Sequence, residues 1–298
     1  MKTKKTGKKG KEKLIWVAAV LFFLLGAGVF LYPFISNFLA EKNHEKVIDS
    51  YKAKVEKISS EDLEKEWEEA KIYNENLAGD PVHDPFIVGS GYAVPDNYNE
   101  VLNVDSSGVM CYLEIPKINL NLPVYHGTSE EVLQRGAGHL EMTALPIGGE
   151  NRRSVLTGHR GLPSAELFTR LDEMEVGDYF FIHVLDQTLA YQVNEIKTVK
   201  PEELQKLNVN PKGEDLVTLV TCTPYGVNTH RLLVTGERTD YVPEIKEQEE
   251  KVPLTTRLMP WRYYIAGGAA ALGIIAAVMI TMKILRYRKY GKKRKKKR

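Results

Sequence analysis

The sequence predicts a mainly β domain, either a barrel or a sandwich, which is preceded by a helical segment and flanked by two membrane-spanning helices. Short β-rich runs separated by Gly, Pro and Asn fill the middle of the chain, between residues 109 and 234. Long uncharged apolar stretches lie at residues 14–40 and 263–282. A chain of 298 residues is long enough for one large domain or two small ones.

Both ends of the chain are strongly basic. Residues 1–13 hold seven lysines and one acid, and residues 283–298 hold eleven lysines and arginines and no acid. Basic runs also occur in nucleic-acid-binding proteins, but here each adjoins an apolar stretch of the roughly 20 residues that cross a bilayer. Because Lys/Arg flanks stay cytoplasmic, we expect two cytoplasmic tails, an extracytoplasmic portion over residues 41–262, a cell-membrane location and no nucleic-acid partner.

Each apolar stretch has an alternative interpretation. Residues 14–40 could be a cleaved signal peptide, but the apolar region is long for one and lacks a clear small-x-small cleavage site. Residues 263–282 could form a buried core helix, which the basic tail beyond them argues against. We therefore expect a retained anchor at 14–40 and a second transmembrane helix at 263–282.

Residues 41–78 favour helices outside the membrane. Apolar side chains recur at helical spacing from Val47 to Ile58, and Ser59 or Ser60 can cap a second helix whose first turn is acidic. This segment is either a solvated stalk or a pair of helices packed on the main domain. Residues 79–95 contain several Gly and Pro residues and are predicted to form a loop.

The β domain is expected over residues 96–238, and a polar linker over 239–262 leads to the second apolar stretch. Strands this short, with frequent turn residues, are typical of barrels and sandwiches. A short helix is expected at 164–171. The predicted strands span residues 110–115, 120–125, 153–157, 179–184, 189–198, 215–221 and 231–237.

Only two cysteines are present, Cys111 and Cys222. An extracytoplasmic domain with so few cysteines does not depend on a disulfide framework. The two could form a single bridge, but free thiols are favoured. Cys111 lies in a strand-like run that suits a small buried side chain, whereas Cys222 has polar residues suited to catalysis nearby in the sequence.

Cys222 follows the apolar run 216–220 and is expected at a strand end. A loop follows it, and Arg231 begins the next predicted strand; if the two strands pair antiparallel, Arg231 returns beside Cys222. His159 follows another strand in a Thr-Gly-His-Arg-Gly turn. A thiolate is the nucleophile in acyl transfer, an imidazole can move its protons, and a guanidinium can stabilise an oxyanion.

A cysteine with a histidine is by itself a weak indication, since a lone cysteine in a strand is more often a small core residue. His139 is a rival base or a loop-ordering residue, and His126 and His183 are expected in strands or turns. If Arg231 faces the thiol, strand alternation turns His230 away. Neither closely spaced cysteines nor a His/His/Glu helix supports a zinc site, so we expect no metal and no cofactor.

The segment Thr218, Leu219, Val220, Thr221 and Cys222, with Arg231 on the next strand and His159 upstream, resembles the signature of sortases. Sortases are the cell-wall transpeptidases of Gram-positive bacteria, and the similarity extends over roughly residues 109–238. It is most specific for class C, the pilus-assembling sortases, whose lid carries an Asp-Pro-aromatic motif. Asp84, Pro85 and Phe86 match this motif, and the C-terminal apolar stretch is also typical of that class.

The resemblance implies a closed β-barrel that acts on proteins carrying a sorting signal of the Leu-Pro-x-Thr-Gly type. Cys222 would take the acyl group after cleavage between Thr and Gly, with His159 as general acid/base and Arg231 as stabilising cation. A pilin lysine amine would then resolve the intermediate. Asp84 is expected to pair with Arg231 and Phe86 to cover the thiol, although Asp80 with Pro81 is a competing Asp-Pro pair.

Two other functions compete with this one. A housekeeping-type sortase would attach surface proteins to a cell-wall precursor amine, but the second apolar stretch and the lid-like motif argue against it. A non-catalytic membrane-tethered scaffold would have no need for Cys222, His159 and Arg231 together.

Overall fold

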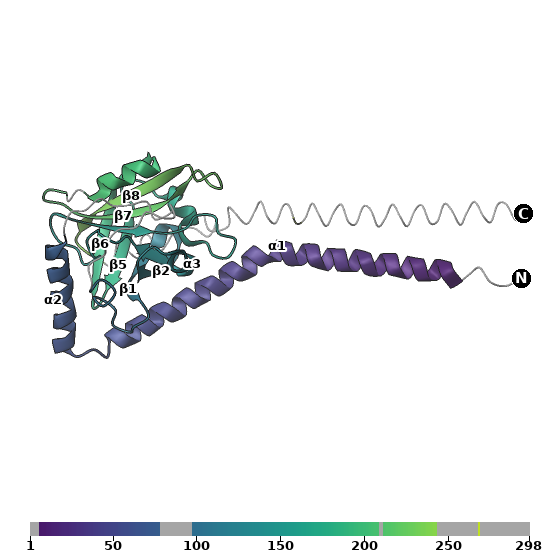
Figure 1. Ribbon diagram of the computed structural model, residues 1–298, viewed down its shortest axis with the longest axis horizontal. Helices are drawn as coiled ribbons and strands as arrows, with labels where there is room; N and C mark the ends of the chain where they lie inside the picture. The colour runs from purple at the N-terminus through teal and green to yellow at the C-terminus, as the bar shows by residue number, and fades with distance from the viewer. Residues whose placement is uncertain (1–5, 78–96, 209–210, 243–267, 269–298) are drawn as a thin grey trace, which may run out of the picture. The chain divides into compact units, whose positions relative to one another are not determined.

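Eight strands form a closed barrel in the computed structural model, which describes residues 6–77, 97–208, 211–242 and 268 (Figure 1). Around the barrel the strand order is β1-β2-β3-β4-β7-β8-β6-β5. This confirms the predicted barrel rather than a sandwich. The strands are β1 (Val109–Ile115), β2 (Leu120–His126), β3 (Ala137–His139), β4 (Arg152–Thr157), β5 (Tyr179–Val184), β6 (Gln187–Val199), β7 (Asp215–Thr223) and β8 (His230–Thr239).

Two parallel pairings set the topology: β2 with β3, and β4 with β7. Parallel neighbours need a crossover, and α3 (Glu130–Arg135) makes the short one between β2 and β3. The longer one, from β4 to β7, contains η2 (Leu167–Glu173), β5, β6 and η3 (Pro201–Asn208), while η1 (Pro116–Ile118) joins β1 to β2. The long crossover brings the turn after β4 beside the end of β7.

The barrel encloses the main apolar core, which includes Leu113, Phe180 and Tyr191. The rings of Phe180 and Tyr191 stack with centroids 5.5 Å apart. Gly236 on β8 permits this arrangement, since a Cβ at that position would lie 2.5 Å from the ring of Phe180. The interior is thus filled by side chains, and a reaction centre has to lie at the rim.

Two helices precede the barrel, α1 (Thr6–Val55) and α2 (Ser60–Asn76). The sequence places a span over residues 14–40 and a helical segment over 41–78, whereas the structure joins the first part of that segment to the span in one helix that continues through Pro33. Ser59 caps α2 by accepting a hydrogen bond from the backbone N–H of Asp62 at 3.1 Å.

Both helices contact the barrel, so residues 41–76 are not a free stalk. The Tyr51 hydroxyl of α1 donates to the carbonyl of Met110 at 3.1 Å and accepts from the N–H of Leu185 at 2.8 Å. On α2, the indole N–H of Trp67 donates to Asp186 at 2.9 Å. The two Tyr51 bonds are buried and fix the position of α1, because an unpaired buried polar group is costly, whereas the Trp67 bond is exposed.

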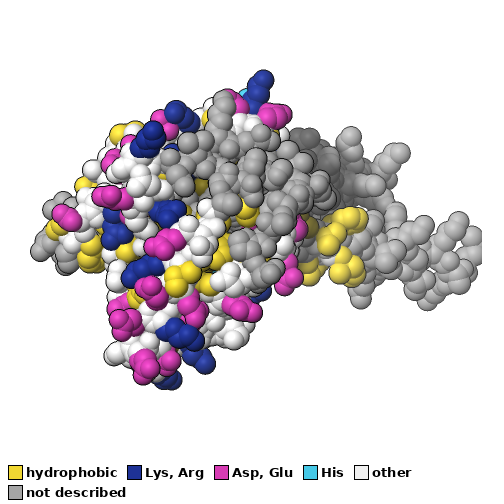
Figure 2. Space-filling view, turned by 60° about the vertical axis from the view of Figure 1, so that its left-hand side comes forward, with side chains coloured by type: hydrophobic (Ala, Val, Ile, Leu, Met, Phe, Trp, Pro, Cys, Tyr) yellow, Lys and Arg dark blue, Asp and Glu magenta, His cyan; other side chains and the backbone are white. Residues whose placement is uncertain are grey.

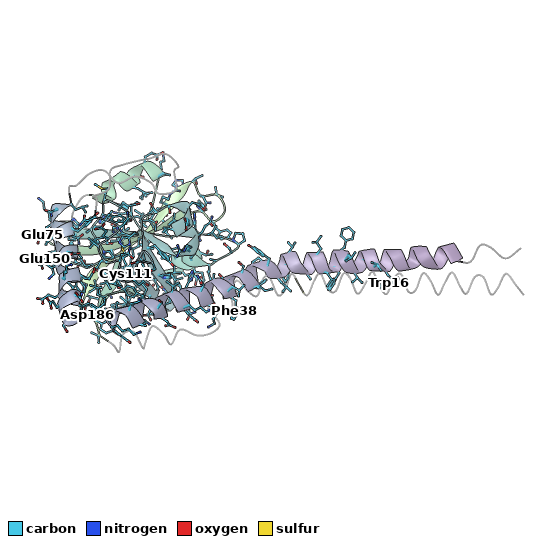
Figure 3. The ribbon with its side chains drawn as sticks, turned by 60° about the horizontal axis from the view of Figure 1, so that its bottom comes forward. Trp16, Phe38, Glu75, Cys111, Glu150 and Asp186 are labelled. Atoms are coloured by element: carbon cyan, nitrogen blue, oxygen red, sulfur yellow. The ribbon has the colours of Figure 1, made fainter. Side chains whose placement is uncertain are left out.

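Between residues 16 and 39, α1 carries many exposed apolar side chains, among them Trp16 and Phe38 (Figure 3). Among the described residues, α1 is the one helix long and apolar enough to cross a membrane. The predicted second span at 263–282 lies outside the described residues except for residue 268, as do the tails 1–5 and 283–298.

Charged side chains of both signs are interspersed over the described part of the face in Figure 2. Several form exposed pairs along helices, such as Lys65 with Glu69 on α2 at 3.6 Å. Each pair of this type contributes only about 0–1 kcal/mol, so the stability of the domain rests on the barrel core.

Candidate active site

Cys222 and Arg231 lie directly opposite each other in the antiparallel pair of β7 and β8. Directly opposed residues project from the same face, with Cβ atoms about 4.5–5.5 Å apart. The expected return of Arg231 beside Cys222 is therefore what the register produces. Cys222 is the second-last residue of β7, so the thiol lies within the strand, one position before its end.

Arg231 is held by the loop that joins the two strands. Its Nη1 donates to the backbone carbonyls of Asn228 and His230, both at 3.0 Å. The side chain is buried, with 4 % of the residue exposed. A guanidinium remains charged in such surroundings, so a fixed positive charge lies beside the thiol, and a nearby cation favours the thiolate.

His159 is placed beside Cys222 by hydrogen bonds from both of its sequence neighbours. The N–H of Gly158 donates to the carbonyl of Val220 at 3.1 Å, and the hydroxyl of Thr221 donates to the carbonyl of Gly158 at 2.7 Å. On the other side, Arg160 donates to the hydroxyl of Thr223 at 3.1 Å. The histidine turn is thus attached to the residues just before and just after the thiol.

Gly158 also explains how the turn fits against η2. A Cβ on this residue would lie 2.8 Å from the ring of Phe168, closer than side chains pack. Phe168 in turn donates its N–H to the carbonyl of His159 at 3.0 Å. The absence of a side chain at Gly158 therefore lets an aromatic ring support the backbone under the imidazole.

Sequence analysis did not identify Glu130, which the structure brings to the site. Its Oε2 lies 3.4 Å from Nε2 of His159, and its side chain is 68 % exposed. Glu130 is at the start of α3, where an acidic residue is favoured by the helix dipole. Nothing in the local sequence separates this carboxylate from an ordinary first-turn acid, because only the β2–β3 crossover places it near His159.

The rival residues Cys111 and His139 are sealed inside the barrel, and both are 0 % exposed. Nε2 of His139 lies 2.9 Å from the carbonyl of Ala144, and Nδ1 lies 2.9 Å from the hydroxyl of Tyr98. Burial lowers the pKa of His139 to about 4 and raises that of Cys111 well above its usual range. Both cysteines are free thiols, so the structure contains no Cys111–Cys222 bridge.

The other histidines of the barrel are also occupied by structural contacts. His230 is next to Arg231 on β8, so alternation along the strand directs it to the opposite face. The ring contacts are those of His126 with the carbonyls of Gly108 and Val101, His183 with Glu114 and Thr188, and His230 with Thr229. None of these contacts brings the ring to Cys222.

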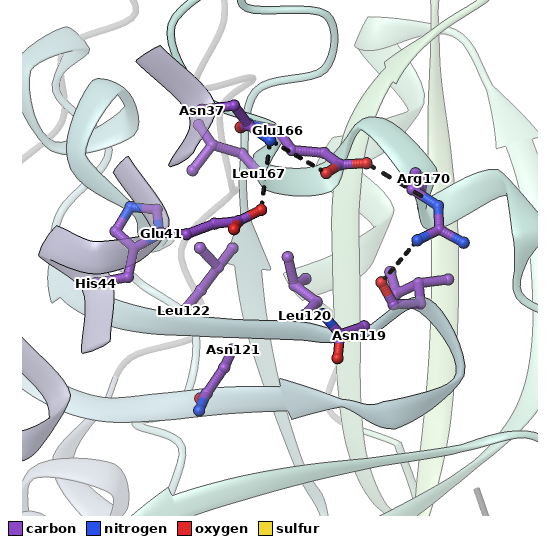
Figure 4. A pocket seen from close by; sticks show the side chains of 11 residues that line it. Asn37, Glu41, His44, Asn119, Leu120, Asn121, Leu122, Glu166, Leu167 and Arg170 are labelled. Atoms are coloured by element: carbon purple, nitrogen blue, oxygen red, sulfur yellow. Dashed lines mark hydrogen bonds and ion pairs between the residues drawn. The ribbon is translucent and has the colours of Figure 1, made fainter. Parts of the chain in front are cut away.

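The far side of the histidine turn is supported by α1. Asn37 accepts a hydrogen bond from the N–H of Glu166 at 2.6 Å (Figure 4). Ser36 donates to the carbonyl of Ser164 at 3.0 Å. A small cavity of about 40 Å³ lies at this junction. Cys222, His159 and Arg231 do not line it, so the cavity belongs to the helix–barrel junction and not to the candidate site.

The predicted lid residues Asp84 and Phe86, and their competitor Asp80, fall within 78–96 and lie outside the described residues. The described part of the site therefore consists of the β7–β8 pair, the histidine turn with Phe168 beneath it, and the start of α3.

Comparisons with known proteins identify the family to which this fold belongs. Residues 113–239 match the Sortase domain. Among solved structures, sortase C of Streptococcus pneumoniae is 46 % identical, with 66 % of this chain and 97 % of that chain covered and a TM-score of 0.59. Sortase C-1 of Actinomyces oris is 47 % identical, with 61 % and 99 % covered and a TM-score of 0.58. Sortase A of Bacillus anthracis is 26 % identical over 76 % of this chain and 95 % of its own length.

The identities to the solved structures extend over nearly the whole of those chains. In this barrel Cys222 lies opposite Arg231, and the His159 turn is bonded to the strand that carries Cys222. A thiol with a neighbouring cation and histidine is the set of groups that cysteine acyl-transfer enzymes use. The chain therefore belongs to the sortase family of cysteine transpeptidases.

Proposed function

We propose that the protein is a class C sortase, which cleaves a Leu-Pro-x-Thr-Gly-type sorting signal between Thr and Gly and joins the acyl group to a pilin lysine. The observation that carries this proposal is the opposition of Cys222 and Arg231 across β7 and β8 beside the His159 turn. Similarity to sortases C at 40–47 % identity supports the class. One of these neighbours is described in connection with pilin substrate specificity.

In the acylation step, the thiolate of Cys222 attacks the carbonyl carbon of the signal threonine. The carbonyl oxygen becomes an oxyanion, which the guanidinium of Arg231 stabilises. The C–N bond to glycine then breaks, and protonated His159 gives its proton to the leaving amine. The products are a thioester on Cys222 and a released peptide that begins with glycine.

In the second step, the neutral amine of a pilin lysine attacks the thioester. His159 accepts the proton that this amine loses, and the C–S bond breaks to regenerate the thiolate. One amide has been exchanged for another, so the reaction needs neither an oxidant nor a nucleotide. Repetition on successive subunits yields a polymer joined by isopeptide bonds.

A housekeeping-type sortase remains the second candidate. Several curated relatives are named sortase A, including those of Bacillus anthracis and Staphylococcus aureus at 26 % and 25 % identity. That enzyme would use the same acylation step but a cell-wall precursor amine as acceptor. The two candidates therefore differ only in the nucleophile of the second step.

Mass spectrometry of the acyl-enzyme tests both steps. Incubation with a Leu-Pro-x-Thr-Gly peptide should add the mass of the threonyl fragment to Cys222 and none to a Cys222→Ala variant. Addition of a pilin domain with an accessible lysine should discharge the thioester into an isopeptide. Discharge by a short cell-wall-type peptide amine but not by pilin lysines would select the housekeeping function instead.

We further propose that α1 is a retained membrane anchor and that both termini are cytoplasmic. The support is the apolar α1 helix together with the basic residues at 1–13 and 283–298. External protease on intact protoplasts should digest residues 41–262 and spare both tails, as detected with terminal epitope tags. Loss of the C-terminal tag before permeabilisation would contradict the two-span topology.

A further inference from the structure

Arg160, the residue after His159, connects three segments around the candidate site. Its Nη1 donates to the hydroxyl of Thr223 at 3.1 Å. Its Nη2 forms an ion pair with the carboxylate of Asp172 on η2. The guanidinium carbon also lies 5.8 Å from the ring centroid of Tyr225. The segments joined are the histidine turn, η2 and the end of β7 with its following loop.

These contacts are formed by a side chain that is only 8 % exposed, while that of Asp172 is 49 % exposed. The buried guanidinium of Arg160 is therefore a positive charge close to the site. Arg160 follows His159 in the sequence, and its guanidinium bonds to Thr223, the residue after Cys222. A planar guanidinium can contact a carboxylate, a hydroxyl and an aromatic face together, which a lysine ammonium cannot do in one geometry. The arrangement therefore requires the shape of arginine as well as its charge.

The contacts of Gly158 hold the start of the histidine turn to β7. Gly158 bonds to Val220 and Thr221, which precede Cys222. Among the contacts described between the histidine turn and β7, the Arg160–Thr223 bond is the one that lies beyond Cys222. The bond from the N–H of Phe168 to the carbonyl of His159 holds the turn to η2. Loss of the Arg160 contacts would therefore release the turn from the end of β7 and let the imidazole move relative to the thiol.

We propose that Arg160 is a positioning residue that sets the distance between the His159 imidazole and the Cys222 thiol. This inference rests on the proposed roles of these two residues. Arg160 itself takes no part in bond breaking. It acts through the bond to Thr223 and the pair with Asp172, which together hold the histidine turn against the end of β7.

The proposal predicts a specific kinetic change. Arg160→Gln should lower kcat for a Leu-Pro-x-Thr-Gly peptide by about 10- to 100-fold, because a displacement of about 1 Å in a reacting group can cost about 100-fold. KM should change by less than about threefold, since an interaction used only in the transition state affects kcat. Arg160→Lys should be almost as poor, because it retains the charge but loses the planar geometry.

A second measurement uses no sorting-signal peptide. Alkylation of Cys222 by iodoacetamide, followed by mass spectrometry as a function of pH, reports how readily the thiol gives up its proton. Arg160→Gln should slow alkylation near neutral pH and move the midpoint of the profile to higher pH. Thr223→Val removes only one of the contacts and should shift the profile in the same direction by less, which keeps the test open if Arg160→Gln fails to fold.

Arg170→Gln is the matched control. Arg170 on η2 is also buried and pairs with the carboxylate of Glu173 at 2.7 Å. It also pairs with Glu166 at 4.0 Å and donates to the carbonyl of Ile118 at 3.0 Å (Figure 4). We expect Arg170→Gln to lower the melting temperature and to leave the alkylation profile unchanged. A wild-type profile and kcat in Arg160→Gln or in Arg160→Lys would overturn the proposal. Absence of Cys222-dependent cleavage in the wild type would instead refute the proposed function, while the alkylation comparison would still decide the role of Arg160.

Discussion

Two regions of the barrel each contain a cysteine and a Gly-His pair. On the β1–β3 side these are Cys111 and His139, and at the β4–β7–β8 rim they are Cys222 and His159. The inner pair is 0 % exposed, and burial holds both groups in their neutral forms by raising the pKa of the thiol and lowering that of the imidazole. The rim pair lies beside the guanidinium of Arg231.

The difference shows that residue type alone does not create a catalytic pair. In the β1–β3 region His139 completes a hydrogen-bond network with Tyr98 and Ala144, so a charge there would cost free energy. At the rim, a strand end and a turn meet around a fixed positive charge. The same two side chains are therefore structural in one place and suited to acyl transfer in the other.

The largest expected effect contrasts the two cysteines. Cys222→Ala should abolish both peptide cleavage and polymer formation, since the neutral buried thiol of Cys111 cannot replace it as nucleophile. Cys111→Ala should retain cleavage per folded molecule and cost about 1 kcal/mol of stability, a typical value for one substitution. Chromatographic cleavage assays and urea unfolding measure the two effects. Activity in Cys222→Ala with loss in Cys111→Ala would reverse the assignment.

The next effect concerns the groups that surround the rim thiol. His159→Ala should lower kcat/KM by about 10²- to 10⁴-fold, the range for a general acid/base. Arg231→Ala should lower it by about 10²- to 10³-fold, as for loss of an oxyanion donor. Arg231→Lys should also be poor, because lysine lacks the planar fork that can contact two oxygens. Circular dichroism should show intact folds, and near-normal rates in any of these variants would exclude that residue from its role.

The third effect is a pH dependence of the free energy of unfolding, which the buried His139 causes. Folded His139 has a pKa of about 4 against 6.5 in its ordinary state. Between these values the unfolded chain binds a proton that the folded chain does not, so the free energy of unfolding falls as pH falls. From pH 7 to pH 5 the loss is about 2 kcal/mol, because the slope approaches about 1.4 kcal/mol per pH unit only below pH 6.5.

A comparison of wild type with His139→Gln isolates this term, because His44 is also buried with a lowered pKa and contributes to both proteins. Urea unfolding at pH 7 and pH 5 should show a smaller loss of stability in the variant. If the variant does not fold, an NMR titration of the wild type should find the His139 ring neutral at pH 5. Parallel pH dependences, or a ring protonated at pH 5, would contradict the assignment.

The sequence was sufficient for most of the barrel because its strands are apolar runs bounded by turn residues. Seven strands were predicted to within two residues at each end, from β1 to β8. Strand β3 was missed because Ala137–His139 has only three residues with a glycine in the middle, and it exists through pairing with β2 and β4. The predicted helix at 164–171 is instead the 3₁₀ helix η2, Leu167–Glu173.

The candidate site also has residues whose positions the sequence predicts and residues whose positions it does not. Cys222 and Arg231 could be paired from the sequence because a short loop between two strands fixes their register. Glu130 and Arg160 could not be assigned a place, since their contacts with His159 and Thr223 depend on the long-range crossovers that close the barrel. The local sequence pattern predicts which side chains face each other across neighbouring strands. Which loops and turns lie close together depends on the complete strand topology.

The smallest expected effect sharpens the contrast between the two thiols through the predicted lid. Asp84 is expected to pair with Arg231 and Phe86 to cover Cys222, as the class C resemblance implies. An exposed ion pair contributes about 0–1 kcal/mol, so Asp84→Ala should raise the rate of Cys222 alkylation by no more than about fivefold. Phe86→Ala should act in the same direction, and the two changes can be combined in one variant.

Two internal references make this small change measurable. Asp80→Ala alters the competing Asp-Pro pair and should change the rate much less than Asp84→Ala. Cys111 is sealed in the core, so it should remain unlabelled in every folded variant and report any unfolding. Equal Cys222 labelling rates in the wild type and in the Asp84 and Phe86 variants, with Cys111 still protected, would rule out a lid at these residues. The rim thiol would then differ from the inner one by the Arg231 guanidinium opposite it and the His159 turn beside it, without a lid.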